Sequence, residues 1–563
     1  MTQSRKPELP NDLLRYILNR RRLLGGAAGA GMAVAGLAGG AAAPDFVART
    51  QPSRAQQAGG KLTFAIWQSP ESLDPAVSGL ISAGYVFSQI YEPLIWRMPG
   101  IKEGTEFFPG LAESWEVSDD VTTYTFHLRT DVKFHDGTPL TADAIKVSYD
   151  HIVDPNTKSA SAATALGPYD HTEVVDDYTA KVVFKEPNGS FLNTVANDAQ
   201  FSPGSPTALQ ADAAGFGQHP VGTGPFMFKE WVVDDHVTVV KNPDYAWPSQ
   251  VFANQGQAYL DEVTFRIIPD ASTRMNSLKT GDVDMAENPP PQDVEGFASD
   301  PDNYQVFHAT TTGMPYCVMV NCANPPTDDV KVRQALEYAV SQEQIIDTLY
   351  KGVYEPAHNL FLPGTTGRDD SLNSMYTYNP DKAKQLLDEA GWILDGDVRK
   401  KDGQELKLKF INLAGFGFDD ISTLMQAQFQ EIGIQTDITA EAFPAVGDTL
   451  NNGNGGHNLT DFFYYAPDPF FMRALFACDQ VGKGFNWMHY CNPDVDKMVT
   501  EGNATSDSAK RQEIYAAAAK KVMEDATFIP IYEQAAVFPA KKNVTGLMFT
   551  TTGGPLFYNV SVA

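Results

Sequence analysis

The most informative stretch of this 563-residue chain reads FPGLAESWEVSDDVTTYTFHLR at 108–129 and continues as VKFHDGTPLTAD at 132–143. Residues 123–129 alternate apolar and polar side chains, which predicts a half-buried strand. The His-Asp-Gly sequence at 135–137 is a turn signal, and a helix is predicted over 141–152. A strand, a turn and a helix in close succession are typical of an α/β fold.

The same alternation of strands and helices continues outward from this stretch. Residues 341–344 (SQEQ) form a capping box that opens a helix ending at Gly352. Asn379 and Pro380 supply an N-cap and a proline at the first helical position, and Gly391 ends that helix. Further strands are predicted at 61–67, 407–412 and 435–439, and a further helix at 424–432. Short connections between such elements predict α/β lobes.

Charge and composition restrict the classes of partner. The chain is 43% hydrophobic, so it is long and apolar enough for two or three domains. Residues 1–58 contain eight Lys/Arg and three Asp/Glu, which leaves 34 basic and 67 acidic residues, a net charge of −33, in the remainder. A body this acidic repels phosphate backbones and anionic lipid surfaces. Nucleic acid is therefore excluded as a partner, and the acidity keeps the protein soluble.

The motifs of common enzyme classes are missing from the sequence. There is no phosphate-binding glycine loop, no nucleophile elbow and no H-E-x-x-H, and the four cysteines have no zinc spacing. His457 and His489 flank a glycine-rich and aromatic segment, where either a metal role or an ordinary structural role is open. The sequence predicts no cofactor, no metal site and no catalytic residues.

The N-terminus has the pattern of an export signal. Arg20 and Arg21 resemble a twin-arginine motif and precede an uncharged run at 23–43 that is rich in Ala and Gly. We expect cleavage, at 41–43 or at 55–58, rather than retention as an anchor. No cysteine lies near the end of the run, so a lipid anchor on cysteine is not expected. The mature chain is predicted to work outside the cytoplasm.

Aromatic residues are abundant, with 33 Phe, 22 Tyr and 7 Trp, and they cluster at 462–471 (FFYYAPDPFF) and at 485–487 (FNW). Rings with a few polar groups suit a small-molecule cleft. The alternative is a strand core that ends in a stiff turn. That alternative is favoured for Phe462 and Phe463, and both possibilities stay open for Tyr465, Asp468 and Trp487.

An ordered series of motifs resembles the dipeptide/oligopeptide/nickel-type solute-binding proteins of ABC importers, known as family 5. The resemblance covers nearly all of residues 61–563. The motifs are 108–129, 132–143, PVGTGPF at 220–226, NPDYAW at 242–247, 274–284, VRQAL at 332–336 and YNPDKA at 378–383.

The resemblance implies a two-lobed periplasmic-binding-protein fold with a ligand cleft between hinged lobes. Lobe I would comprise residues 61–310, with an extra subdomain at about 95–210. Lobe II would comprise 311–528, and 529–563 would return to lobe I, after a signal and linker at 1–58. Members of the family have no enzymatic activity. The expected partners are a small solute and an ABC permease with its cytoplasmic ATPase, and the chain is expected to be a monomer.

The resemblance also implies site residues. Cys478 and Cys491 match a loop that carries a disulfide in relatives, which export makes plausible, whereas Cys317 and Cys322 lie five apart in a predicted strand, too far to bridge. The segment from Ser69 to Tyr85 faces the cleft in relatives. The predicted ligand-binding residues are Tyr85 from lobe I, Tyr316 near the lobe crossing, and Tyr465, Asp468, Asn486 and Trp487 from lobe II.

One departure from the family pattern bears on the ligand. Peptide-binding relatives carry an aspartate, just before the Asp-Pro of the aromatic loop, that pairs with the ligand's α-ammonium group. Here Tyr464-Tyr465-Ala466 runs directly into Pro467-Asp468, no acid occupies that place, and Asp461 comes too early in the strand. This departure argues against recognition of a zwitterionic peptide and leaves a solute without a free amino terminus, a sugar or another solute, such as a metal chelate, as the alternatives.

Two rival classes stay open beside the importer component. A periplasmic chaperone or receptor can use the same fold without a permease, because fold does not fix function. A secreted enzyme is the other rival, and twin-arginine export of cofactor-loaded proteins is its best support, although no catalytic or metal-ligand set accompanies it.

Overall fold

The structure is a computed structural model that describes residues 58–97, 107–159, 161–196, 199–414, 417–452, 456–466 and 468–562. The predicted signal with Arg20 and Arg21, both candidate cleavage sites except Ala58, most of the linker, and Pro467 lie outside the described residues. Within the described part of the chain, no helix combines the length and apolar character needed to cross a bilayer.

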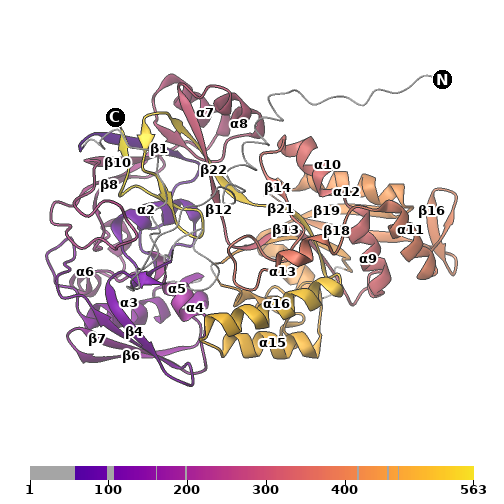
Figure 1. The fold of residues 1–563 in the computed structure, drawn as a ribbon, viewed down its shortest axis with the longest axis horizontal. Coiled ribbons are helices and arrows are strands. Elements are labelled where there is room, and N and C mark those ends of the chain that lie inside the picture. Colours follow the sequence, from indigo (N-terminus) through magenta and orange to yellow (C-terminus); the bar gives the residue numbers. More distant parts are fainter. Residues whose placement is uncertain are drawn as a thin grey trace, which may run out of the picture. The chain divides into compact units, whose positions relative to one another are not determined.

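Lobe I is built on a seven-stranded sheet (Figure 1). Its strands, in spatial order, are β12 (Tyr304–Thr310), β22 (Ala535–Lys541), β11 (Met285–Ala286), β1 (Lys61–Ile66), β10 (Glu262–Ile267), β9 (His236–Lys241) and β8 (Phe226–Val232). β1 lies parallel to both β10 and β11, so the carboxyl ends of these three strands meet at one edge of the sheet. Ligands of α/β proteins bind at such an edge.

A separate four-stranded sheet contains most of the stretch at 108–129. Its strands are β4 (Ala112–Val117), β5 (Thr123–Leu128), β7 (Thr179–Phe184) and β6 (Tyr169–Asp176). The predicted strand and helix are confirmed as β5, with alternating burial, and as α3 (Ala142–Val153), which lies against β6 and β7. This sheet is the central part of the predicted extra subdomain.

Lobe II is built on a six-stranded mixed sheet. Its strands, in spatial order, are β14 (Glu355–Pro356), β21 (Phe528–Glu533), β13 (Gly313–Val320), β20 (Leu459–Tyr465), β18 (Lys407–Ala414) and β19 (Gln435–Ala442). The predicted strands at 407–412 and 435–439 are confirmed as β18 and β19, each slightly longer than expected. Two sheets, each with its own hydrophobic cores, confirm the two-lobed α/β fold.

The predicted helix caps of lobe II are present. The Asn379 side chain accepts a hydrogen bond from Lys382 N at the start of α11 (Pro380–Glu389), and the Ser341 hydroxyl accepts one from Gln344 N. The helix that Ser341 opens is shorter than predicted. α10 (Gln342–Ile345) widens into a π-helical turn at 346–350, and Lys351 ends it with a left-handed φ of 53°, one residue before Gly352.

The remaining helices cover the sheets and the subdomain (Figure 1). In lobe I they are α2 (Ile81–Ile90), α4 (Ser161–Leu166), α5 (Phe191–Val195), α6 (Pro206–Ala211), α7 (Ala271–Thr280) and α8 (Pro291–Ala298); in lobe II they are α9 (Val330–Ala339), α12 (Asp419–Glu431), α13 (Phe443–Asn451), α14 (Phe471–Phe476), α15 (Pro493–Asn503) and α16 (Ser508–Glu524). The helix predicted at 424–432 is the second part of α12.

The chain passes between the two sheets twice. β12 continues into β13 through Thr311 and Thr312, and β21 continues into β22 through Gln534. The Thr311 hydroxyl donates to Gln534 O at 3.1 Å, so the two passages lie side by side. The predicted end of lobe II at residue 528 is too early, because β21 pairs with β13 and buries its side chains in lobe II. Short paired segments of this kind are the usual hinges of two-lobed proteins.

Candidate functional site

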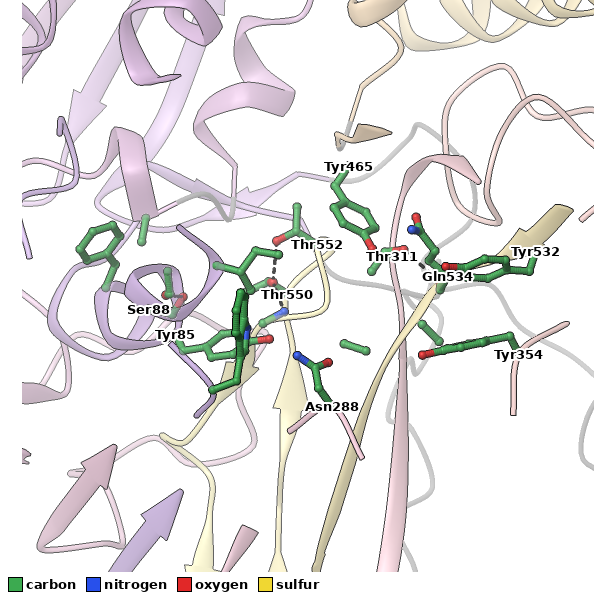
Figure 2. A pocket seen from close by; sticks show the side chains of 18 residues that line it. Tyr85, Ser88, Asn288, Thr311, Tyr354, Tyr465, Tyr532, Gln534, Thr550 and Thr552 are labelled. Carbon is green, nitrogen blue, oxygen red and sulfur yellow. Dashed lines mark hydrogen bonds between the residues drawn. The ribbon is translucent and has the colours of Figure 1, made fainter. Parts of the chain in front are cut away.

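A cavity of about 240 Å³ lies where the two passages meet the first helix of lobe I (Figure 2). Figure 2 shows Tyr85 and Ser88 on one side of it and Tyr354 and Tyr532 on the other. Thr311, Gln534, Ala535 and Ala536 of the passages, with Asn288, Thr550, Thr552 and Gly554, complete much of the wall. Both lobes and both passages therefore contribute to one site.

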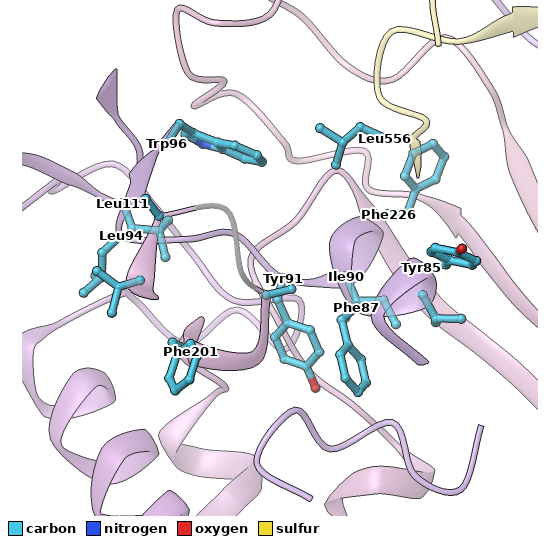
Figure 3. Packing of buried hydrophobic residues seen from close by; sticks show 14 of the residues in the cluster. Tyr85, Phe87, Ile90, Tyr91, Leu94, Trp96, Leu111, Phe201, Phe226 and Leu556 are labelled. Atoms are coloured by element: carbon cyan, nitrogen blue, oxygen red, sulfur yellow. The ribbon is translucent and has the colours of Figure 1, made fainter. Parts of the chain in front are cut away.

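Helix α2 supplies much of the lobe I wall. Ile81, Gly84, Tyr85 and Ser88 recur at the spacing of one helical face, and all four line the cavity. Much of the rest of the helix packs into the lobe I core, where Figure 3 shows Phe87 and Ile90 among the buried side chains. A Cβ atom built on Gly84 would have no neighbour within 4 Å. The open space beside α2 thus depends on glycine at this position.

Three tyrosines form the lobe II wall. Tyr354 and Tyr532 stack with ring centroids 5.0 Å apart, and Tyr465 comes from the carboxyl end of β20. Tyr316 is fully buried behind Tyr532, with which it stacks at 5.1 Å, and its hydroxyl donates to Asp461. These rings present flat apolar faces with hydroxyl groups at their edges, which suits a ligand that is partly apolar and partly polar.

Among the described residues that line the cavity there is no Asp, Glu, Lys, Arg or His. The polar groups are amides and hydroxyls, and one of them has an unused acceptor: Gln534 Oε1 is buried without a hydrogen-bond partner among the described residues. Buried polar atoms are almost always hydrogen-bonded in native proteins. Gln534 Oε1 is therefore available to a donor on a bound molecule.

A carboxyl group lies directly behind the lobe I wall. Glu287 follows β11, is fully buried, and accepts a hydrogen bond from Trp67 N at 2.7 Å through Oε1. Burial raises the pKa of the Glu287 carboxyl group to about 7, against the lowering effects of the Trp67 N–H group, of Arg274 and of the Tyr85 hydroxyl. Its neighbours Trp67, Tyr85 and Asn288 all line the cavity.

Two of the six predicted ligand residues, Tyr85 and Tyr465, line the cavity, and their role in binding stays a prediction. Tyr316 does not line it, because Tyr532 stands in front of it. Residues that the sequence analysis missed include Trp67 and Gly84. Glycine inside a helix was the available signal for Gly84, since glycine is unfavourable there without a packing or functional reason.

Asp468 is a structural residue, so its assignment to the ligand was wrong. Its carboxylate is fully buried and accepts hydrogen bonds from Arg511 Nη2 at 2.6 and 2.7 Å and from Asn193 Nδ2 at 2.7 Å. Phe470 N donates to the same carboxylate. With both oxygens occupied, Asp468 fixes the loop after β20 and does not face the cavity.

Asn486 and Trp487 are also structural. Asn486 is fully buried and exchanges hydrogen bonds with the backbone of Tyr490, while the Trp487 ring packs against Phe462 and Phe485 in a lobe II core. The loop that contains them is closed by a disulfide between Cys478 and Cys491. Cys317 and Cys322 are free thiols. The expectation that Trp487 contacts the ligand is therefore corrected.

Trp487→Ala is accordingly expected to destabilise the protein by about 3–5 kcal/mol, because the substitution leaves a cavity in the core. Urea denaturation of the variant and the wild type measures this difference. A variant of wild-type stability with weakened solute binding would contradict the structural role and restore Trp487 to the binding site.

The two lobes also touch away from the passages. The hydrogen bonds that cross between them include Asn193 Nδ2 to Asp468 Oδ2 at 2.7 Å, Gly189 N to Asn503 O at 2.6 Å, and Arg97 Nη2 to Gly364 O at 3.2 Å. In each case the first residue belongs to lobe I and the second to lobe II. Together with the paired passages, these contacts hold the two lobes, and so the two walls of the cavity, against each other.

No group of three or more His, Cys, Asp or Glu residues is placed to hold a metal ion in the described part of the chain. His457 is buried and its ring bonds to Trp487 O, and the ring of His489 bonds to Leu450 O. These hydrogen bonds support the structural role for both histidines.

The chain is similar in sequence and in structure to several known proteins. Residues 106–483 match the model of the bacterial extracellular solute-binding proteins, family 5. The dipeptide-binding protein of Escherichia coli K12 is 30% identical over 547 residues, covering 89% of this chain and 94% of that protein. The haem-binding protein A of Haemophilus influenzae is 28% identical, covering 88% and 91%. The structure of DppA from Helicobacter pylori with the peptide STSA has a TM-score of 0.69 at 26% identity, covering 90% and 98%.

Proposed function

Because the chain belongs to family 5 of the bacterial extracellular solute-binding proteins of ABC importers, we propose that it captures a peptide-like solute between its lobes and delivers it to an ABC permease. The observation that carries this proposal is the cavity at the paired passages, whose wall combines residues from both lobes. A solute held there contacts both lobes at once, so its binding energy favours the closed arrangement over the open one.

The composition of the wall supports a peptide-like solute. Tyrosine and tryptophan rings accept apolar side chains, and the amide and hydroxyl groups pair with a peptide backbone. Relatives named for dipeptides, and one solved with the peptide STSA bound, have ligands of this chemistry. The relative named for haem shows that the same fold also carries other ligands, which makes a direct ligand screen necessary.

The remaining features of the proposal concern the location and activity of the protein. Family 5 members are extracellular transport proteins rather than enzymes, and we assign the same role to this chain. We further propose export through the segment with Arg20 and Arg21 and cleavage after the apolar run. A disulfide between Cys478 and Cys491 suits an oxidising compartment.

A thermal-melting screen of the mature protein against dipeptides, tripeptides, oligosaccharides and metal chelates tests the proposed function. A peptide present at 100 times its dissociation constant is expected to stabilise the folded protein by about 2.7 kcal/mol. A rise in melting temperature with sugars or chelates, but not with peptides, would show that the solute belongs to one of those classes instead. No shift with any compound would contradict solute capture and favour a receptor or chaperone.

A further inference from the structure

Two buried acceptor oxygens lie at the cavity with unused acceptor sites among the described residues: Gln534 Oε1 has no donor, and Glu287 Oε2 has none at normal hydrogen-bond geometry, although the nearby Tyr85 hydroxyl lowers the pKa of this carboxyl group. Gln534 lines the cavity at the passage from β21 to β22, and Glu287 lies behind Trp67, Tyr85 and Asn288. Buried polar atoms are almost always hydrogen-bonded in native proteins. Two such acceptors at the cavity can each take a hydrogen bond from a donor on the ligand.

Glu287 differs from three other buried acids of the structure, Glu92, Asp461 and Asp468. Glu92 receives hydrogen bonds from the Tyr245 hydroxyl and from Trp247 Nε1, one on each oxygen. Both oxygens of Asp461 and of Asp468 are likewise bonded. Among the described residues, Glu287 Oε2 is the one buried carboxylate oxygen without a partner. This unpartnered oxygen of Glu287 lies beside the cavity.

The nearest cation does not neutralise Glu287 by direct contact. Arg274 lies close enough to affect the Glu287 pKa, but its guanidinium group donates to the backbone carbonyls of Glu287, Ile268, Pro269 and Asn288. These bonds occupy all three nitrogens of the group. Glu287 therefore has no ion-pair partner in the part of the chain that the structure describes, and a cation on a bound solute would supply one.

Strand geometry places Glu287 where a ligand can use it. β1 and β11 are parallel neighbours, and Trp67 and Glu287 follow directly after them, at the edge of the sheet where α/β proteins bind ligands. Trp67 lines the cavity, is 42% exposed, and donates its backbone N–H to Glu287 Oε1.

From these contacts we infer that the solute carries an amine cation that lies against the wall formed by Trp67, Tyr85 and Asn288, with Glu287 as its counter-charge. A second donor, such as an amide N–H, bonds to Gln534 Oε1. The acid that selects the amine thus belongs to lobe I, at the end of β11, and not to the aromatic loop of lobe II. This inference rests on the proposed function and specifies the solute class further.

Binding of matched peptide pairs to Glu287→Gln tests the inference. The probes are dipeptides and their N-acetylated counterparts, titrated calorimetrically. The wild type is expected to bind the free amine at least roughly tenfold more tightly than the acetylated form, a difference of about 1.4 kcal/mol. Glu287→Gln keeps the shape of the side chain, removes the charge and is expected to abolish this preference.

Glu337→Gln is the matched control. Glu337 is also a buried glutamate whose pKa is raised by burial, but it lies in α9 and does not line the cavity. The control is expected to retain the full preference for the amine. An unchanged preference in Glu287→Gln, or a wild type that binds both forms equally, would overturn the inference. A wild type that binds neither form would overturn the proposed function itself.

The pH dependence gives a second readout that a purely structural role of Glu287 would not produce. Arg274 and Tyr85 are the charged or titratable groups that act on this carboxyl group. Below its pKa the carboxyl group is neutral and attracts a cation weakly. Affinity for the free amine is therefore expected to rise between pH 5.5 and 7.5, in the wild type only. The acetylated peptide and Glu287→Gln are expected to show no such rise.

Discussion

Gly84→Phe is expected to weaken solute binding by roughly 100-fold or more, equivalent to about 2.7 kcal/mol, while the protein stays folded. The space next to Gly84 is part of the 240 Å³ cavity, and nothing else lies within 4 Å of the position of a Cβ atom. A phenylalanine ring there occupies the volume that the solute needs. Stability is not expected to fall, since replacing glycine within a helix favours the helix by up to about 1 kcal/mol.

Gly296→Phe is the control for this substitution. Gly296 lies in α8, is exposed, and also has nothing within 4 Å of a Cβ atom, but it does not line the cavity. The control is expected to bind solute like the wild type. Calorimetric titration of the wild type, Gly84→Phe and Gly296→Phe with the peptide identified in the thermal-melting screen measures the three affinities. Equal affinity of Gly84→Phe and the wild type would show that the solute binds elsewhere.

Gly189→Ala is expected to weaken solute binding by about 5- to 150-fold by opposing lobe closure. A Cβ atom at Gly189 would lie 2.2 Å from Thr505 O and 2.9 Å from Asn503 O, which are backbone atoms of the opposite lobe. In the variant, the two lobes are forced apart at this contact. This destabilises the closed arrangement by about 1–3 kcal/mol. Gly189 is not in the left-handed region of φ, so alanine adds no strain within lobe I itself.

Small-angle X-ray scattering with a peptide bound distinguishes this effect from a local defect. The variant is expected to have a larger radius of gyration than the wild type at the same peptide concentration, and the two are expected to match when saturated. Gly447→Ala in α13, where the added Cβ atom has open space, is expected to behave like the wild type. A Gly189→Ala protein that binds and closes like the wild type would exclude this contact from the closing motion.

Local patterns were sufficient to predict most of the fold. The alternation at 123–129 and the caps at Ser341 and Asn379 depend on neighbours within four residues, and each appears in the structure where it was expected. The boundary at residue 528 depends on pairing between β21 and β13, which are more than 200 residues apart in sequence. A local pattern carries no information about such a pairing.

The site was predicted less well for the same reason. The sequence shows that Asp468 and Trp487 lie near aromatic residues, but not that Arg511 neutralises the first or that Phe462 and Phe485 enclose the second. Tyr85 was found because its segment faces the cleft in relatives, and Tyr465 because it lies in the aromatic cluster at 462–471. Glu287 was missed because its significance lies in an unfilled hydrogen bond, which only the assembled structure reveals.

Native mass spectrometry tests the central claim most directly. The mature protein and Gly84→Phe are incubated with an equimolar pool of dipeptides and tripeptides, and the masses of the intact complexes are recorded. We predict that the wild type carries one peptide per chain, enriched in members with a free amino terminus, and that Gly84→Phe carries none. A wild type that retains no peptide, or a variant that retains the same peptides as the wild type, would contradict solute capture in this cavity.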